Sequence, residues 1–572
     1  MKAADYIATF LENNGVTHVF ELVGGMITFL LDSLHQHTSI KIVSMRHEQG
    51  AGFAAEGYGR MTGIPGVAMA TSGPGATNLL TAIGSCYFDS TPAVFITGQV
   101  NRHEQKGERS IRQLGFQETD IVSMSRPITK AVWSVQDPEE LPKRLAEAFA
   151  LAVSGRPGPV LLDIPMDVQR AEVSDDFFDI KPVATGQPLE LAGFAERLRQ
   201  ALQKAQRPLI LAGGGVRLSH SAELLQKVAE HWGTPVVHSL MGVDILPASH
   251  PLRVGMIGSY GNRWANIAIN ESDMLIVLGS RLDIRQTGAN VESFRGQRQI
   301  FHVDCEAGEM NNRVTQCDTL KCELSVFIEE MLTRSRFVYE AKAWRERLTM
   351  LQKAWPDTGE FRGLPGINPN MLMRELSAVS ATAAAFVVDV GQHQMWAAQS
   401  LQLEPGQRFL TSGGMGAMGF ALPASIGACL GADRRPVVMV AGDGGFQLNI
   451  QELQTIVGNG LPIKLVVMNN LCHGMVRQFQ ESYFKGRYQS TLWGYSAPNF
   501  AAVAGAYGIA AERVELPTEV PTALGRLWGN PSTPYLLEVM LDTRANAYPK
   551  MAFGRAISEM EPLATPMDME GT

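Results

Sequence analysis

The sequence predicts an α/β protein built from three Rossmann-like, doubly wound parallel-sheet domains. Apolar runs of strand length alternate with stretches of helical period along nearly the whole chain, which is typical of parallel sheets covered by helices. Several of these runs end directly in glycine-rich turns, as at 24–25, 213–215 and 442–445. A length of 572 residues corresponds to about three domains, at roughly 100–200 residues per domain.

The first predicted domain spans residues 1–171. Helices are expected at 5–14 and 48–61, and they alternate with strands expected at 16–22, 40–45, 67–70, 93–97 and 160–164. The polar, irregular stretch 172–188 that follows is expected to be a linker.

The second predicted domain spans residues 189–334, and the third spans 365–555. The second begins with a strand at 208–212, and a charged helical segment at 339–355 precedes the third. In the third domain, strands are expected at 385–389, 437–441, 464–468 and 535–539.

Composition and charge restrict the function classes. A formal net charge of −8 argues against non-specific nucleic-acid binding, which depends on basic surfaces that neutralise phosphates. The 6 cysteines lack C-x-x-C spacing, so free thiols in a reducing compartment are the simplest interpretation. The chain starts without an apolar signal core, and no apolar run reaches the roughly 20 residues of a membrane span. We therefore expect a cytoplasmic protein with no membrane partner and no nucleic-acid partner.

The strongest local motif is Gly442-Asp443-Gly444-Gly445 at the end of an apolar strand. Glycines let backbone N–H groups approach a phosphate, and an adjacent carboxylate can hold a divalent cation. Asn470 follows the next predicted strand, 470 − 443 = 27 residues later, which is enough for one strand–helix–strand crossover. Asp443 and Asn470 should therefore meet where α/β sheets bind ligands, as a pair of oxygen ligands suited to Mg²⁺. The alternative is an ordinary Asp-Gly turn.

Two further motifs have both a functional and a structural interpretation. Glu48 opens a helix rich in small residues and has few charge partners nearby, so it can share a proton with a ligand. It can also be a helix-start carboxylate stabilised by the helix dipole. The glycine-rich run 410–420 allows a ring to lie against the backbone, with Met418 as an apolar wedge. It can equally be a packed helix entry with core methionines.

Together these motifs resemble the thiamine-diphosphate-dependent enzymes of the acetolactate synthase group. The resemblance extends along nearly the whole chain, and the order and spacing of the motifs are specific. The matching stretches are 46–49, 71–78, 96–100, 116–118, 391–396, 413–420, 442–444 and 469–470.

The resemblance implies a pyrimidine-binding, a central and a diphosphate-binding domain of the thiamine-diphosphate enzyme type. It implies that Glu48 activates thiamine diphosphate, and that Phe116 and Gln117 face the reacting carbon. The implied Mg²⁺ ligands are Asp443, Asn470 and the main-chain carbonyl of Cys472. The remaining implied cofactor contacts are Gly391, Gln392, His393, Gly416, Met418, Gly442, Gly444, Gly445 and Met475.

The resemblance also implies partners and a second cofactor. Glu48 and Asp443 would meet across a subunit interface, so a homodimer is the minimum unit and a homotetramer is plausible. The central domain resembles members that hold FAD, with a structural role because decarboxylation and carboligation transfer no net electrons. A tight turn in a relic fold is the alternative. The residues implied to touch FAD are Gly213, Gly214, Tyr260, Gly261, Asn262, Arg281 and Arg285.

Three departures concern the second substrate. Phe479, with Val476 beside it, stands where biosynthetic acetolactate synthases carry a tryptophan, and Glu21-Leu22-Val23 replaces the usual start of a Tyr-Pro-Gly-Gly-type turn. The loop 101–115 is long and basic, with Arg102, Lys106, Arg109 and Arg112. In these features the chain resembles the ketone-accepting carboligases of yersiniose-type branched-sugar biosynthesis.

The main prediction is therefore transfer of a two-carbon unit from pyruvate to a nucleotide-linked 4-keto-deoxy sugar. The alternative is an acetolactate synthase that joins two pyruvates, with loop 101–115 as a variable solvated surface. A simple 2-oxo acid decarboxylase is less expected, because that class carries a His-His pair in this loop and only His103 is present. An FAD-dependent pyruvate oxidase would use the flavin chemically and consume oxygen.

Overall fold

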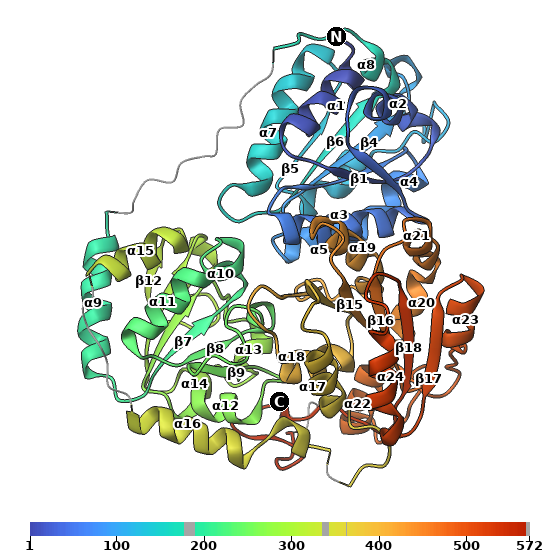
Figure 1. Cartoon of the computed structure of the whole chain (residues 1–572). Coiled ribbons are helices and arrows are strands. Elements are labelled where there is room, and N and C mark those ends of the chain that lie inside the picture. The colour runs from blue at the N-terminus through green and yellow to red at the C-terminus, as the bar shows by residue number, and fades with distance from the viewer. Residues whose placement is uncertain (177–188, 335–341, 362, 568–572) are drawn as a thin grey trace.

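A computed structural model describes residues 1–176, 189–334, 342–361 and 363–567, and it confirms the predicted α/β class (Figure 1). Three separate six-stranded sheets follow one another along the chain, and every strand pair within them is parallel. Most of the predicted linker, residues 177–188, lies outside the described residues.

The first sheet has the order β2-β1-β3-β4-β6-β5. Its core lies on both faces, with α1 (Ala3–Asn13), α2 (Thr28–His37) and α7 (Leu141–Val153) packed on one face. The other face is covered by α3 (Glu48–Thr62) and α5 (Leu80–Phe88). The strands are β1 (His18–Leu22), β2 (Lys41–Ser44), β3 (Gly66–Ala70), β4 (Ala93–Gln99), β5 (Ala131–Ser134) and β6 (Pro159–Pro165).

The third sheet repeats this topology. Its order is β14-β13-β15-β16-β18-β17, which is 2-1-3-4-6-5 when the strands are counted within the domain, as in the first sheet. Neighbouring helices include α18 (Gln392–Ser400), α19 (Ala421–Gly431), α20 (Asp443–Leu448) and α22 (Gly474–Tyr483). The strands are β13 (Ala385–Val388), β14 (Arg408–Thr411), β15 (Val437–Gly442), β16 (Ile463–Asn469), β17 (Ala510–Val514) and β18 (Tyr535–Met540).

The central sheet is ordered differently. Read as β9-β8-β7-β10-β11-β12, it has the order 3-2-1-4-5-6, which is the strand order of dinucleotide-binding folds. The strand order reverses between β7 and β10, so this is where a ligand crevice is expected. The strands are β7 (Pro208–Ala212), β8 (Val236–His238), β9 (Arg253–Met256), β10 (Met274–Leu278), β11 (Gln299–Asp304) and β12 (Asp318–Lys321).

The first and third domains pack against each other through α3 and α19, which each follow the second strand of their own sheet (Figure 1). The two helix backbones approach very closely at glycines. A Cβ on Gly57 would collide with the carbonyl of Ala424, and one on Gly427 would collide with the carbonyl of Ala54. Small residues in both helices therefore permit a contact that larger side chains would prevent.

The last described segment returns to the central domain as a short antiparallel hairpin, which the sequence patterns did not predict. It consists of β19 (Lys550–Met551) and β20 (Met560–Glu561). The Met551 N–H donates to the carbonyl of Ser259 at 2.7 Å, and Arg263 donates to the carbonyl of Glu561.

All six cysteines are free thiols, in agreement with the sequence interpretation. Within the described ranges, no helix combines the length and the apolar character needed to cross a membrane.

Candidate cofactor site

Asp443 and Asn470 come together at one edge of the third sheet, as their spacing predicted. They directly follow β15 and β16, which are paired in parallel with Gly442 opposite Met468. Asp443 is buried and accepts a hydrogen bond from the Tyr495 hydroxyl at 3.0 Å. It also accepts from the backbone N–H groups of Cys472 and Gly444. Burial raises the pKa of Asp443 to about 6, against these hydrogen bonds, and a bound cation would favour its charged form.

The donor set at this edge fits Mg²⁺. The Asn470 amide nitrogen donates to Gln392 Oε1 at 3.0 Å, so its amide oxygen is the atom left for a cation. Within the described ranges, no three His, Cys, Asp or Glu side chains cluster as a metal site. A cation here would therefore be held by one carboxylate and one amide oxygen, with further oxygens from the main chain, phosphate and water. Mg²⁺ binds in this way in phosphate sites.

The neighbouring strand β13 contributes the groups predicted for the diphosphate. Gly391 precedes α18, whose first two residues are Gln392 and His393, and all three lie at the point where the strand order reverses. A Cβ on Gly442 would lie 2.9 Å from His393 Nδ1, so only glycine permits this approach. Burial lowers the pKa of His393 to about 3, and its Nε2 has no partner among the described residues. A buried, unpaired atom of this kind can be satisfied by a bound ligand, an ion or water.

The glycines that follow Asp443 are also enclosed by neighbouring groups. A Cβ on Gly444 would lie 2.7 Å from His473 Cε1, and one on Gly445 would lie 2.8 Å from Asp389 Oδ1. Both positions therefore require glycine, because a side chain would collide with these neighbours.

The run 413–420 lies beside this edge. The Met418 methyl group is 3.5 Å from the position of a Cβ on Gly444, so the side chain reaches the start of α20. Gly416 has φ +68° and nothing within 4 Å of its Cβ position, which leaves its backbone open on that side. This placement agrees with the functional interpretation of the run, although an apolar packing role for Met418 has the same geometry.

Glu48 is the first residue of α3 and is only 7% exposed. Asn78 donates to Glu48 Oε2 at 2.9 Å, and Glu48 forms no ion pair within the described parts of the chain. The first turn of α3 contacts the third domain, where the Arg46 N–H donates to Glu452 and Asn449 donates to Gln49. Glu48 is thus a buried carboxylate at a domain contact.

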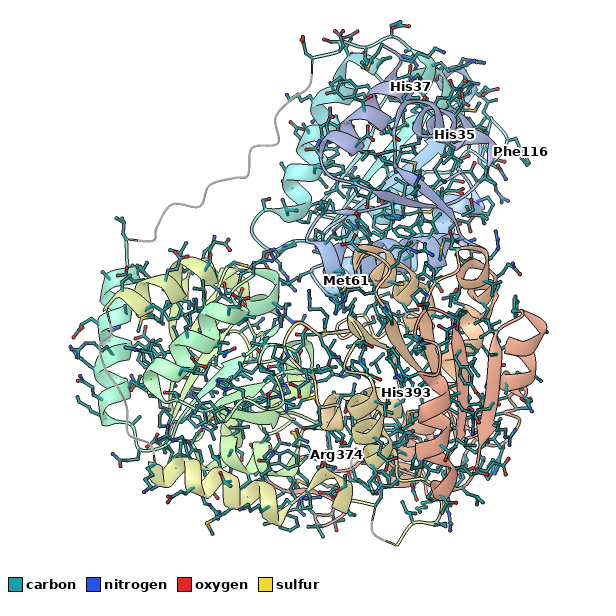
Figure 2. All side chains as sticks on the ribbon, viewed as in Figure 1. His35, His37, Met61, Phe116, Arg374 and His393 are labelled. Carbon is teal, nitrogen blue, oxygen red and sulfur yellow. The ribbon has the colours of Figure 1, made fainter. Side chains whose placement is uncertain are left out.

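Phe116 and Gln117 are not brought to the diphosphate edge of their own chain. Phe116 is 80% exposed and projects from the outer side of the first domain, away from His393 in the third (Figure 2). Gln117 has φ +65°, a conformation that costs energy in a residue with a side chain. Its Cβ lies against Gly73, where a second Cβ would be 2.9 Å away.

The predicted acceptor residues lie on the exposed face of α22. Val476 and Phe479 are 53% and 41% exposed, and Met475 lies in the same helix. The Phe479 ring centroid is 4.9 Å from that of Tyr483 and 5.8 Å from that of Phe484. Phe479 is thus part of an aromatic cluster at the surface of the single chain.

The basic loop 101–115 is less open to an anionic ligand than the sequence suggested. Arg102 pairs with Asp167 at 2.7 Å, and Arg109 donates to the carbonyls of Gln105 and Lys106. The Glu118 carboxylate accepts from the backbone N–H groups of Lys106 and Leu114, which fixes the loop from inside. Two of its four basic side chains are therefore engaged within the first domain.

A cavity of about 740 Å³ opens at the strand-order reversal of the central sheet, and residues of the first and third domains complete its lining. Of the residues predicted to touch FAD, it is lined by Gly214, Tyr260, Arg281 and Arg285. The other three lie behind the lining. Gly213 packs against the Gly279 backbone, Gly261 packs against Ile257, and Asn262 bonds to Met256 and Gln399.

Sequence reasoning missed two buried residues that organise the site. Asp389 accepts from the backbone N–H groups of Gly419 and Ala421 at 3.0 and 3.1 Å, so it anchors the 413–420 run. Gln478 accepts from Gln392 at 3.2 Å and from the Ala547 N–H at 2.8 Å. The sequence signal for Asp389 was a carboxylate directly after the strand β13. No sequence signal pointed to Gln478.

Comparison with known proteins identifies the three domains. Residues 1–124 match the family model "Thiamine pyrophosphate enzyme, N-terminal TPP binding domain". Residues 195–331 match the central domain of the same family, and 389–539 match its C-terminal TPP binding domain. Thiamine pyrophosphate is another name for thiamine diphosphate.

Curated relatives extend over the whole chain. Acetolactate synthase 2, chloroplastic, from Nicotiana tabacum is 37% identical over 582 residues, covering 98% of this chain and 85% of the relative. The acetolactate synthase isozyme 2 large subunit of Escherichia coli K12 is 37% identical over 563 residues, covering 98% and 99%. The acetolactate synthase large subunit of Corynebacterium glutamicum is 36% identical over 575 residues, covering 98% and 90%. The chain therefore belongs to the family of thiamine-diphosphate-dependent enzymes, with acetolactate synthases among its relatives.

Proposed function

We propose that this protein is a carboligase of the acetolactate synthase type, which decarboxylates pyruvate and joins the two-carbon unit to a second 2-oxo acid. The observation that carries the proposal is the alignment with the E. coli isozyme 2 large subunit, which covers 98% of this chain and 99% of that one at 37% identity. The Asp443–Asn470 edge and the buried Glu48 supply the polar groups that this chemistry needs.

The chain's own residues have separate tasks in this proposal. Asp443, Asn470 and the Cys472 carbonyl would hold Mg²⁺, and Gln392, His393 and the backbone N–H groups of the 442–445 turn would hold the diphosphate. Bound thiamine diphosphate supplies the electron sink for decarboxylation. Glu48 would hydrogen-bond to the aminopyrimidine ring and could exchange a proton with it. Met418 would offer an apolar contact to the ring.

The working unit in this proposal is a homodimer, in which Glu48 of one subunit meets Asp443 of the other. Within one chain, Phe116 projects into solvent on the side away from His393, so it cannot face a substrate held in its own third domain (Figure 2). Val476 and Phe479 are also exposed. A second subunit would cover these apolar surfaces and place Phe116 and Gln117 over the cofactor.

FAD is proposed for the cavity of the central domain. The 3-2-1-4-5-6 strand order and the glycine-lined reversal point are those of dinucleotide-binding sheets. Arg285 adds positive charge to the lining, as a pyrophosphate requires, whereas Arg281 pairs with Asp283 at 3.2 Å. Its role is structural, because the proposed reaction transfers no net electrons.

Transfer to a ketone such as a nucleotide-linked 4-keto-deoxy sugar is the second candidate. It is favoured by Phe479, a phenylalanine at the surface of α22 in the position where the family resemblance implies a tryptophan. Loop 101–115 offers an anionic acceptor less positive charge than its composition suggests, because Arg102 and Arg109 are engaged within the first domain. The relatives named above are all acetolactate synthases, so joining two 2-oxo acids is the better-supported activity.

Product analysis tests the proposal. The purified protein is incubated with thiamine diphosphate, Mg²⁺, FAD and pyruvate, with and without a nucleotide-linked 4-keto-deoxy sugar or a simple ketone. Efficient acetolactate formation that is unaffected by the ketone supports the proposal. A tertiary alcohol formed from the ketone, with only slow acetolactate formation, would establish the second candidate instead.

A further inference from the structure

Glu48 is held by one side chain that no step above uses. Asn78 ends the short helix α4 (Pro74–Asn78), and its amide nitrogen donates to Glu48 Oε2 at 2.9 Å. This is the only side-chain hydrogen bond of Asn78 within the described residues. Asn78 therefore does not cap its own helix. Its side-chain amide donates to the Glu48 carboxylate instead.

The turn that carries Asn78 is held in place independently of Glu48. It follows β3, which is paired on both sides in the sheet, so its starting point is fixed. The Met26 N–H donates to Thr71 Oγ1 at 3.3 Å, and Thr77 Oγ1 donates to the Pro74 carbonyl at 3.1 Å. Asn78 is thus a donor on a rigid support, which is the condition for orienting another side chain.

The two oxygens of Glu48 consequently have different surroundings. Oε2 is occupied by Asn78, whereas Oε1 lies over Gly75, 3.3 Å from the position of a Cβ. Gly75 offers Oε1 no side chain, and the carboxylate has no ion pair among the described residues to turn it another way. Oε2 therefore already accepts a hydrogen bond, and Oε1 can accept one from a ligand.

We propose that Asn78 is the positioning residue of Glu48: it holds Oε2 so that Oε1 faces the aminopyrimidine ring of the cofactor. This inference rests on the proposed function, because it assumes that Glu48 acts on that ring. Asn78 itself touches neither cofactor nor substrate. Its loss should therefore slow proton exchange on the bound cofactor and leave cofactor affinity nearly unchanged.

The test uses the full-length protein loaded with thiamine diphosphate and Mg²⁺, as wild type, Asn78→Ala, Asn78→Asp and Asn78→Gln. One readout is the exchange rate of the proton at C2 of the bound cofactor in D₂O, measured by NMR after acid quenching. The second is the dissociation constant of thiamine diphosphate, measured by tryptophan fluorescence. Misplacing a catalytic group by about 1 Å can cost on the order of 100-fold, so we expect exchange in Asn78→Ala to fall by roughly 10- to 100-fold.

The other variants separate positioning from folding. Asn78→Asp keeps the size but places a second carboxylate beside Glu48, so exchange should fall further. Asn78→Gln keeps the amide donor and should restore part of the rate. If Asn78→Ala does not fold, the difference in exchange rate between Asn78→Asp and Asn78→Gln tests positioning instead. Gln36→Ala is the matched control, because Gln36 also donates an amide hydrogen bond to a carboxylate, Asp32, but on the exposed surface of the same domain.

Two results would overturn the inference in distinguishable ways. Exchange in Asn78→Ala and Asn78→Asp within about 2-fold of wild type, while Glu48→Gln is inactive in exchange, would show that Asn78 has no positioning role. Wild-type exchange in Glu48→Gln would instead refute the role of Glu48 in the proposed function, and the inference with it.

Discussion

The first and third sheets share the strand order 2-1-3-4-6-5, but the loops at their carboxyl edges carry different chemistry. After the second strand, the first domain begins α3 with Glu48, whereas the third has the glycine-rich run 413–420. After the third strand, the first domain has the 72–75 turn and the third has Asp443 with its flanking glycines. The common topology determines where a ligand can bind, and the loop residues determine which part of a ligand is bound there.

The difference follows from the functional groups at each edge. The third domain combines a carboxylate, amide groups and close glycine backbones, which suits a cation and a diphosphate. The first domain offers a buried carboxylate with an amide donor and no ion pair within the described residues, which suits proton exchange with a neutral ring. Changes at the first edge should therefore affect chemistry, and changes at the third should affect binding.

The largest expected effect is that of Glu48→Gln. Glutamine keeps the size and the hydrogen bond to Asn78 but cannot exchange a proton, so product formation should fall by at least about 100-fold. Thiamine diphosphate affinity, measured by fluorescence titration, should stay close to that of wild type. Full activity in this variant would remove Glu48 from the proposed mechanism.

Asp443→Ala should instead lower the affinity for the cofactor. Removing the carboxylate should weaken Mg²⁺-dependent binding of thiamine diphosphate by roughly 10- to 100-fold, as measured by isothermal titration calorimetry. Asp542→Ala is the control, because Asp542 pairs with exposed Arg544 in the same domain and should leave affinity unchanged. Equal affinities in the two variants would contradict the placement of the cation at this edge.

Gly57→Ala tests the contact between the two equivalent helices. The added methyl group would collide with the Ala424 backbone, which cannot move aside as a side chain can. Such overpacking costs about 1–3 kcal/mol, so the free energy of unfolding should fall by that amount in urea denaturation. The control is Gly525→Ala in α24 (Val520–Leu527), where nothing lies within 4 Å and alanine should be neutral or stabilising. Similar losses in both variants would mean that close helix packing is not the cause.

The last prediction concerns a buried acid that both sheets carry on their sixth strand. Asp163 accepts from Thr97 and Gln99 on β4, and Glu538 on β18 accepts from Asn469 on β16. Burial raises the pKa of Asp163 from 3.8 to about 7. The folded state thus binds a proton on the Asp163 carboxylate more tightly than the unfolded chain does. Its stabilising contribution is complete below about pH 4 and is lost as pH rises through 7.

Asp163→Asn removes this titration. Between pH 4.5 and 7.5, the stability of the variant relative to wild type should therefore increase, by roughly 2–3 kcal/mol. Urea unfolding at both pH values measures the difference. A constant difference between the two proteins across this range would show that the proton on Asp163 is not linked to folding.

The sequence by itself determined the α/β class, most strands of the first and third domains, and the meeting of Asp443 with Asn470. These depend on local information, because a buried parallel strand is a continuous apolar run and a sharp strand-to-helix turn needs glycine. The family resemblance added the role expected of Glu48, and the three matching domain models agree with that family.

Only the tertiary structure decided how the loops and domains meet. Asn78 lies 30 positions from Glu48, and Asp389 lies 30 positions from Gly419, so neither pairing leaves a periodic signal in the sequence. Four basic residues in loop 101–115 suggested an open cationic surface, whereas Asp167 and local carbonyls engage two of them. A polar side chain can form a hydrogen bond or ion pair with residues far away in the chain. Which partner it has depends on the packing of whole sheets and helices. That packing is a property of the assembled fold and not of any short segment of it.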